Sequence, residues 1–186
     1  MRFALVSNKP RHFNHFYPAT VAVVGVEQGE KVNFMPVVWH VGLSFDPPLF
    51  GVGVSPKRFT FRMLSVATAF SVSFHPYSQA AAIHKLGGVS GREVDKVAAF
   101  DLAVIPGRAL KVPVLAGAYA AYELEKVDQI TTGDHTLFVG RVRGVWEEPA
   151  AFAREALNPA QVEPLLYYGR YRYGRPRSEV LDLEDD

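Results

Sequence analysis

Strand-like and helix-like patterns alternate irregularly along the chain, and the strand-like patterns predominate. Runs rich in β-branched and aromatic residues predict strands at residues 20–26, 32–41, 49–55, 69–74, 118–130 and 136–146. Helical spacing is confined to shorter stretches, at residues 56–64, 77–86 and 90–100 and in a patch after Asn158. Several strands with isolated helices indicate a β-barrel with added helices, not a parallel sheet built from βαβ units.

The segment from Lys31 to Thr60 concentrates the features that suggest a binding site. Its sequence, KVNFMPVVWHVGLSFDPPLFGVGVSPKRFT, is typical of a strand, a corner at Asp46-Pro47-Pro48, a second strand and a helix start. Alternation divides the first strand into two faces, with Asn33, Met35, Val37 and Trp39 on one and Phe34, Pro36, Val38 and His40 on the other. Proline inside a strand predicts an edge strand or a bulge, where backbone groups are free to bind another molecule.

The end of this segment has the chemistry of an anion site. Ser55 is a suitable N-cap and Pro56 a suitable first helical residue, so a helix is expected to begin there. A helix N-terminus offers unpaired N–H groups, and Lys57, Arg58 and the Thr60 hydroxyl would add charge and a further donor. Basic residues in a first turn oppose the helix dipole unless an anion lies nearby. The alternative is an ordinary capped surface helix with solvated basic residues.

Gly51 and Gly53 share a face of the second strand with Ser55. Glycine inside a strand marks close approach by a ligand or tight packing against a neighbouring strand, and both interpretations stay open. The GVGV run lacks the third glycine of a dinucleotide fingerprint, and the phosphate-loop pattern is absent from the chain.

A second basic pair lies in the run SGREVDK. Ser90 and Glu93 have the spacing of a capping box, which predicts a short helix ending near residue 100. Arg92 and Lys96 would then stand one turn apart and repel each other, and an anion between them would relieve the repulsion. The alternative is a solvated helix face on which Glu93 and Asp95 pair with the two cations.

Histidines are the candidate proton-handling groups. His75 ends a predicted strand and His135 precedes one, although each has an ordinary structural role as its alternative. His12 and His15 have an H-x-x-H spacing without a third ligand, so we expect no metal site.

Composition and charge narrow the class of protein. The chain has 186 residues and a formal net charge of +1, which argues against a dedicated nucleic-acid or membrane binder. It has no cysteine, which excludes disulfides, thiolate catalysis and iron–sulfur ligation. No segment approaches the roughly 18 apolar residues of a membrane helix, so a soluble, cytoplasmic protein is expected. The run YYGRYRYGRPR interleaves aromatic and basic residues as single-strand nucleic-acid binders do, but an arm packing across a dimer partner is the favoured interpretation.

Three runs together resemble the flavin reductase-like family, in the branch that contains flavoredoxins and the small reductase components of two-component monooxygenases. They are NFMPVVWHVGLSFDPPLFGVGVSPKRFT, SGREVDK and GDHTLFVGRV, and the match covers most of residues 20–145. The closing run LLYYGRYRYG also looks like the ends of some relatives. The resemblance implies an antiparallel Greek-key split β-barrel, a homodimer, and FMN held near the subunit interface. We expect residues 1–186 to form one domain, with a core at about 18–147 and a C-terminal arm at 148–186.

The resemblance also implies a set of site residues. Val37, Val38 and Trp39 would line the isoalloxazine, and Ser55, Arg58 and Thr60 would hold the phosphate and ribityl end. Arg92 and Lys96 would reach the flavin, and His135 would lie on the nicotinamide side as the candidate catalytic residue. Ser73 stands where many relatives carry asparagine, and His40 replaces a small polar residue. The full set of expected cofactor-binding residues is Val37, Val38, Trp39, His40, Ser55, Pro56, Lys57, Arg58, Phe59, Thr60, Ser73, His75, Arg92 and Lys96.

The function expected from the resemblance is an NAD(P)H:flavin oxidoreductase that supplies reduced flavin to a partner oxygenase. Hydride would pass from the nicotinamide to flavin N5, and the chemistry would belong to the cofactor. Two alternatives stay open. One is a flavoredoxin-type electron carrier with little NAD(P)H activity, and the other is a non-catalytic protein that stores flavin or binds nucleic acid through its C-terminal arm.

Overall fold

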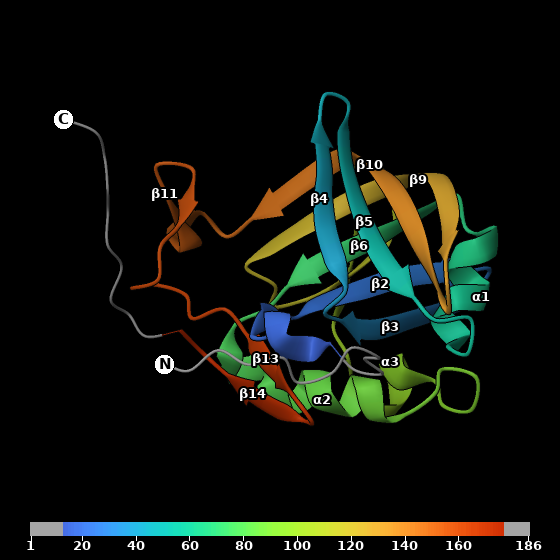
Figure 1. The fold of residues 1–186 in the computed structure, drawn as a ribbon, viewed down its shortest axis with the longest axis horizontal. Helices are drawn as coiled ribbons and strands as arrows, with labels where there is room; N and C mark the ends of the chain where they lie inside the picture. Colours follow the sequence, from blue (N-terminus) through green and yellow to red (C-terminus); the bar gives the residue numbers. More distant parts are fainter. Residues whose placement is uncertain (1–12, 177–186) are drawn as a thin grey trace.

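A seven-stranded antiparallel sheet dominates the computed structural model, which describes residues 13–176 (Figure 1). Its spatial order is β3-β2-β6-β9-β10-β5-β4. The strands are β2 Ala22–Gln28, β3 Lys31–Val37, β4 His40–Phe45, β5 Pro48–Val54, β6 Ala69–Phe74, β9 Ala120–Thr132 and β10 His135–Glu147. The predicted strands at residues 69–74, 118–130 and 136–146 are thus confirmed within a few residues, as is proline on an edge strand, since β3 carries Pro36.

Smaller elements complete the described chain. A three-stranded sheet contains β1 Ala19–Thr20, β13 Leu166–Gly169 and β14 Arg172–Gly174, and two hairpins are formed by β7 Val104–Pro106 with β8 Pro113–Leu115 and by β11 Phe152–Ala153 with β12 Ala156–Leu157. The α-helices are α1 Phe59–Val66, α2 Ala80–Gly88 and α3 Lys96–Ala99, and single 3₁₀ turns, η1 to η3, lie at Asn14–Phe16, Tyr77–Gln79 and Pro149–Ala151. No helix within residues 13–176 is both long enough and apolar enough to cross a bilayer.

The main sheet is curled because its two edge strands are joined by only two residues. β3 ends at Val37 and β4 begins at His40, although these strands lie at opposite edges of the sheet. The Gly53 N–H donates to the Trp39 carbonyl at 2.7 Å, which ties this connection to β5. Register shifts between Val139 and Gly140 and again near residue 143 interrupt the long β9–β10 pairing, and bulges of this kind increase strand bending. The result is an antiparallel split barrel, as the family resemblance implied.

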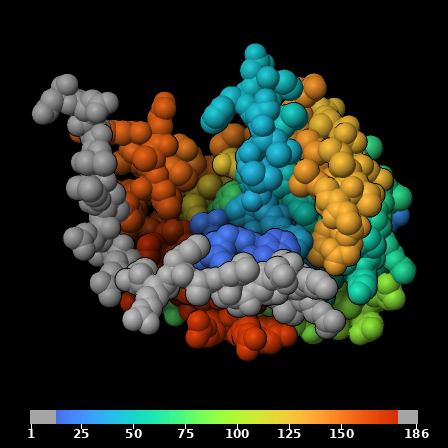
Figure 2. All heavy atoms as spheres, viewed as in Figure 1, coloured from blue at the N-terminus to red at the C-terminus, as the bar shows by residue number. Residues whose placement is uncertain are grey.

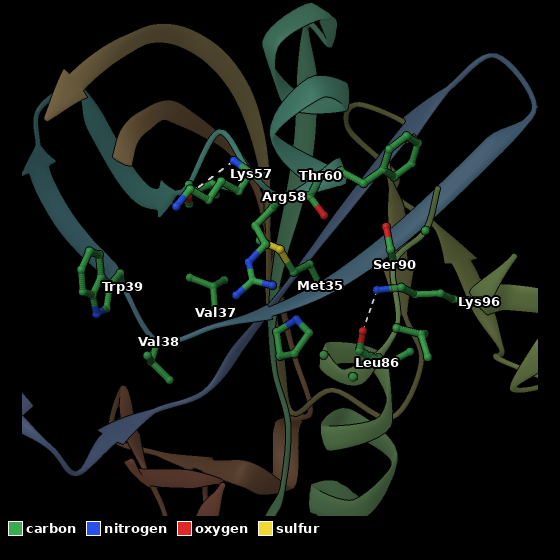
Figure 3. Close-up of a pocket in the computed structure, with 18 of the residues that line it drawn as sticks. Met35, Val37, Val38, Trp39, Lys57, Arg58, Thr60, Leu86, Ser90 and Lys96 are labelled. Atoms are coloured by element: carbon green, nitrogen blue, oxygen red, sulfur yellow. Dashed lines mark hydrogen bonds between the residues drawn. The ribbon is translucent and has the colours of Figure 1, made fainter. Parts of the chain in front are cut away.

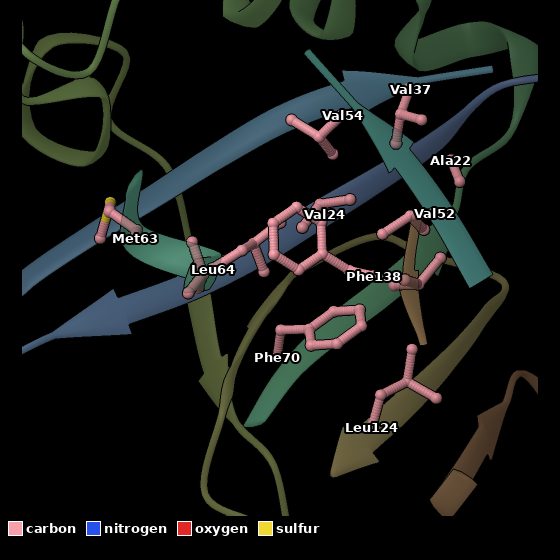
Figure 4. Close-up of a cluster of buried hydrophobic side chains, with 12 residues drawn as sticks. Ala22, Val24, Val37, Val52, Val54, Met63, Leu64, Phe70, Leu124 and Phe138 are labelled. Atoms are coloured by element: carbon pink, nitrogen blue, oxygen red, sulfur yellow. The ribbon is translucent and has the colours of Figure 1, made fainter. Parts of the chain in front are cut away.

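The apolar core lies inside the curl of the sheet and is closed by α1 (Figure 4). Val24 from β2, Val52 from β5, Phe70 from β6 and Phe138 from β10 are fully buried there, together with Leu64 of α1. A second cluster lies on the other side of β2 and β3, against α2. Phe34 belongs to this second cluster and Val37 to the first, as the alternation along β3 predicted.

A buried carboxylate organises the loop between β7 and β8. Glu123 of β9 is fully buried, and its carboxylate accepts hydrogen bonds from the backbone N–H groups of Arg108, Ala109 and Leu110 at 2.6–3.1 Å. The indole N–H of Trp146 donates a fourth bond at 2.7 Å. Burial alone would raise the pKa of this carboxyl, but these bonds outweigh burial and lower the pKa. Glu123 is therefore an ionised anchor for the loop.

Two helix starts differ from the sequence prediction. Residues 55–58 form a turn in which the Arg58 N–H donates to the Ser55 carbonyl at 2.9 Å, and α1 begins only at Phe59. Proline is favoured at the second position of such a turn. The Ser55-Pro56 pair is therefore part of a turn and not the start of a helix. Ser90 likewise opens a turn, because its carbonyl accepts from two N–H groups that follow it. Asp95 is the actual cap of α3, accepting from the Val97 and Ala98 N–H groups at 3.0 and 3.2 Å.

Two further predictions about elements were wrong. The single strand predicted at residues 32–41 is divided into β3 and β4, because its second part pairs with β5 and not with β2. The helix predicted after Asn158 is an isolated turn, in which the Asn158 carbonyl accepts from the N–H groups of Gln161 and Val162. The following residues form the hairpin β13–β14, which pairs with β1 of the same chain. Most of the predicted N-terminal arm lies outside the described residues.

Candidate functional site

A cavity of about 860 Å³ opens between β3, the start of α1 and the connection from α2 to α3 (Figure 3). Its wall is formed by residues 35–39 at and after the end of β3, residues 53–55 at the end of β5, residues 57–60 at the start of α1, residues 86–91 at and after the end of α2, and Glu93, Val94, Lys96 and His135. Because the two edge strands of the sheet meet at residues 38–39, the cavity lies where the barrel is split.

The cavity brings together most of the residues that the sequence predicted. Those in its wall are Val37, Val38, Trp39, Ser55, Lys57, Arg58, Phe59, Thr60, Lys96 and His135. Those outside its wall are His40, Pro56, Ser73, His75 and Arg92.

One side of the cavity is apolar and aromatic. Val37 ends β3, and Val38 and Trp39 follow in the two-residue connection to β4, so three consecutive residues line the cavity. A Cβ added to Gly53 would lie 3.4 Å from the Trp39 Cβ, so the glycine leaves room for Trp39 against β5. Gly51 is different, because an added Cβ would meet Leu137 at 2.9 Å and Leu43 at 3.0 Å. Of the two open interpretations, strand packing therefore explains Gly51.

The other side of the cavity is basic. The guanidinium of Arg58 points into the cavity, and Lys57 lies beside it (Figure 3). The Lys96 ammonium donates to the backbone carbonyls of Phe34 at 2.9 Å and of Leu86 at 2.6 Å. Burial and, to a smaller extent, the positive charge of Arg58 lower the pKa of Lys96 to about 8. An anion placed between these cations would be attracted by both.

His135 stands at the edge of the cavity next to Trp39. The two rings are 4.4 Å apart between centroids. The His135 Nδ1 bonds to the Asp134 carboxylate at 2.7 Å, and this bond is the main reason that the pKa of Asp134 is lowered. Since a carboxylate only accepts hydrogen bonds, Nδ1 carries a proton and Nε2 is left for another partner.

The remaining predicted histidines and Ser73 belong to buried networks away from the cavity. His40 lies between Phe50 and Phe74 and bonds the Thr20 carbonyl at 3.0 Å, and burial lowers its pKa. The Ser73 hydroxyl bonds His75 Nε2 at 2.9 Å, and His75 Nδ1 bonds the Gln79 side-chain oxygen at 2.7 Å.

Arg92 is exposed in the turn after Ser90, so it does not face Lys96 across one helical turn as the predicted helix required. Among residues 13–176, no group of three side chains has the composition of a metal site. His12 of the H-x-x-H pair lies outside the described residues.

We expect acid to destabilise the fold through His75. Burial lowers the pKa of this fully buried imidazole to about 4 from 6.5. The folded state therefore binds fewer protons than the unfolded state between these values, so the stability from neutral His75 is present above pH 6.5 and is lost as the pH falls toward 4. The expected loss is about 3 kcal/mol, since one pKa unit corresponds to about 1.4 kcal/mol. Urea unfolding at several pH values would measure it, and a His75→Gln variant with the same pH dependence as the wild type would contradict it.

The sequence reasoning missed the wall formed by residues 86–91. Gly87 and Gly88 were interpreted only as a helix stop, and Gly91 as part of a capping box. A Cβ on Gly87 would lie 3.0 Å from Pro36, and one on Gly91 would overlap the Asn33 side chain at 2.1 Å. The glycines therefore let the end of α2 and the residues after it lie against β3. The three glycines within residues 87–91 were the feature of the sequence that could have indicated this close packing.

Comparison with known proteins gives several matches. The sequence profile of the flavin reductase like domain matches residues 13–175. An FMN-binding protein from Thermus thermophilus, solved with bound 1-cyclohex-2-enone, is 49% identical, with a TM-score of 0.88 over 98% of this chain and 100% of that chain. The FMN-binding protein from the same organism solved with p-hydroxybenzaldehyde is 50% identical, with a TM-score of 0.87 over the same shares.

More distant relatives also match this chain. An NADH:FAD oxidoreductase from Streptomyces globisporus is 25% identical over 88% of each chain, with a TM-score of 0.72. A protein of Aeropyrum pernix is 31% identical over 161 residues, which cover 86% of this chain and 61% of that protein. The chain thus spans about three fifths of the length of that relative.

Proposed function

Because this chain belongs to the flavin reductase-like family, we propose that its cavity holds FMN and that the protein is an NAD(P)H-dependent flavin reductase. The observation that carries the proposal is the division of the cavity wall into an apolar part and a basic part. Val37, Val38 and Trp39 form the apolar part, and Arg58 and Lys96 supply cations near the start of α1. FMN has the same division, since a flat isoalloxazine ring is joined through a ribityl chain to a phosphate.

The basic part would hold the phosphate. Lys57 and Arg58 would supply charge, the Thr60 hydroxyl a donor, and the first turn of α1 its unpaired N–H groups. A phosphate in this place would attract both Arg58 and Lys96 and so offset the repulsion between them. The backbone of residues 37–39 and the Trp39 ring would lie along the isoalloxazine.

The reaction would need no nucleophilic side chain. The hydride-transfer chemistry, from the nicotinamide C4 to N5 of the flavin, would be supplied by FMN when it is bound. The residues of this chain would bind and orient the reactants and exclude water between them. We infer that a planar nicotinamide would enter beside Trp39 and His135, whose rings are in contact at the edge of the cavity. The electrons would then leave with reduced flavin to a partner oxygenase or another acceptor protein.

Anaerobic mixing of the purified protein with FMN and NADH or NADPH tests the proposal. We expect loss of the oxidised-flavin absorbance within seconds to minutes, dependent on the protein. Loss of absorbance only with a reduced protein donor would favour an electron carrier instead. A protein that binds no FMN in a fluorescence titration would overturn both.

A second activity is favoured by the ligands of the two Thermus thermophilus structures, a cyclic enone and an aromatic aldehyde. We propose that the space beside Trp39 and His135 also admits small planar carbonyl compounds. With an enone, hydride would add to the β-carbon and a proton to the α-carbon, giving the saturated ketone and oxidised flavin. Cyclohexanone should then accumulate when the NADH-reduced protein is given 2-cyclohexen-1-one without oxygen. Persistence of the reduced flavin would exclude this activity.

We also propose that the protein is a homodimer, as the family resemblance implies. Val41, Leu43 and Phe45 alternate along β4, an edge strand, and their side chains are exposed, with Phe45 wholly so. The β4–β5 hairpin stands out from the rest of the molecule (Figures 1 and 2). An exposed apolar row on a protruding edge is typical of a surface that a second copy covers.

The oligomeric state tests this proposal. Sedimentation velocity is expected to give a dimer for the wild type and a monomer for a Leu43→Glu, Phe45→Glu variant, because two buried carboxylates would oppose association. Val66→Glu is the matched control, since Val66 is also exposed but lies on α1. A wild type that sediments as a monomer at micromolar concentrations would contradict the proposal.

A further inference from the structure

An asparagine below the cavity is bonded to one of the wall residues. Asn33 of β3 is only 1% exposed, and its Nδ2 donates to the Thr60 Oγ1 at 2.8 Å. Its Oδ1 is buried and has no hydrogen-bond partner among the described residues. The side-chain amide of Asn33 is held on its other side by Gly91, because a Cβ added to Gly91 would lie 2.1 Å from Asn33 Oδ1. The amide therefore cannot move away from Thr60 in that direction.

This bond determines the direction of the Thr60 hydroxyl. Thr60 is 2% exposed and lies in the cavity wall. Since Oγ1 accepts from Asn33, its one hydrogen must point elsewhere. Within residues 13–176, the hydroxyl of Thr60 donates no hydrogen bond, whereas Ser65 of the same helix donates to the Phe61 carbonyl at 2.8 Å. The Thr60 hydrogen is thus left for an acceptor in the cavity.

The arrangement is costly unless it serves a ligand. A buried amide oxygen without a partner destabilises a fold, and an apolar side chain of similar shape would avoid that cost. The cations of the site lie at the same end, since Lys96 bonds the carbonyl of Phe34, the residue after Asn33, and Arg58 precedes α1. Donors and cations that converge in this way suit an anion with several acceptor oxygens.

We propose that Asn33 is a positioning residue, which holds the Thr60 hydroxyl as a hydrogen-bond donor to the phosphate of FMN. This inference rests on the proposed function and deepens it. Rotating the amide by half a turn would reverse the arrangement, because Oδ1 would then accept the Thr60 hydrogen and the oxygen lone pairs of Thr60 would face the anion. The two orientations therefore predict opposite effects when the Asn33 donor is removed.

Affinities for FMN and for riboflavin, which lacks the phosphate, separate a positioning role from a structural one. We expect Asn33→Leu to weaken FMN binding about tenfold or more, as for the loss of one charge-assisted hydrogen bond. Riboflavin affinity should stay within about twofold of the wild type, because the ring contacts are untouched. Asn33→Asp, which is isosteric, should weaken FMN binding further, since its carboxylate would take the Thr60 hydrogen and repel the phosphate.

A double-mutant cycle identifies the route of the effect. Thr60→Val removes the hydroxyl and keeps the shape, whereas Thr60→Ser keeps the hydroxyl and should retain the preference for FMN over riboflavin. If Asn33 acts through Thr60, adding Asn33→Leu to Thr60→Val should change FMN affinity by no more than about twofold. Additive losses would overturn the inference, as would equal weakening of both flavins, or tighter FMN binding by Asn33→Leu. A wild type that binds neither flavin would overturn the proposed function and this inference together.

Discussion

Replacing Arg58 and Thr60 together by alanine is expected to weaken FMN binding by about a hundredfold or more. Both side chains lie in the basic part of the cavity wall, and the Arg58 guanidinium points into the cavity. Hydrogen bonds to a charged group contribute about 1.5–3 kcal/mol each, and every 1.4 kcal/mol is about tenfold in affinity. Quenching of FMN fluorescence during titration with the protein measures the change.

The matched control for this prediction is Arg62→Ala. Arg62 lies on the same helix and carries the same charge, but it is exposed and outside the cavity wall. Its removal should leave FMN affinity within about twofold of the wild type, because exposed charges contribute little at ordinary salt. Equal losses for Arg62→Ala and the double variant would indicate a general effect of charge. Unchanged affinity in the double variant would refute the placement of the phosphate.

The second large effect is expected on stability, at Glu123. A Glu123→Gln variant should lose about 3 kcal/mol of unfolding free energy, because it loses charged hydrogen bonds and leaves a buried donor unpaired. Oε2 accepts from the Leu110 N–H, and Oε1 accepts from two backbone N–H groups and the Trp146 indole. Whichever way the glutamine amide is turned, its NH₂ group must face at least one of these donors. Urea denaturation at pH 7 measures the loss.

Glu125→Gln is the control on the same strand. Glu125 is about as exposed as its partner Arg143, with which it forms an ion pair at 2.6 Å. A surface pair of this kind contributes about 1 kcal/mol or less, so the variant should unfold close to the wild type. If both variants lost the same stability, the four bonds to Glu123 would not be what anchors the loop between β7 and β8.

Much of the site could be predicted from local residue chemistry. The strand predicted at residues 49–55 is followed at once by Lys57, Arg58 and Thr60. Any turn or helix start at this place brings their side chains close together. All three residues lie in the cavity wall, although the helix begins three residues later than predicted. The hairpin β9–β10 could also be predicted from the sequence, because two long β-rich runs are joined by a short turn at Gly133 and Asp134. His135 at its start lies in the cavity wall as expected.

Other parts could not be predicted, because they depend on pairing between distant segments. The run from residue 32 to 41 has one continuous strand pattern, and only the choice of β2 and β5 as separate partners divides it. His75 is fully buried, and His40 packs against Phe50 and Phe74. No local pattern reports these contacts, and neither histidine lies in the cavity wall. The wall at residues 86–91 reaches the cavity because its glycines can pack against β3, a contact between segments about fifty residues apart.

The sequence by itself therefore determined most of the strands, the alternation of faces along β3, and the chemical types of group that occur between Lys31 and Thr60. These properties depend on neighbours in the chain, through side-chain alternation and turn chemistry. Only the tertiary structure decided where the cavity lies and which groups complete it. The curled sheet brings its two edge strands together at Val38 and Trp39, and it places Asn33 beneath Thr60 across twenty-seven residues. The direction of one hydroxyl hydrogen in the proposed phosphate site is set by that contact.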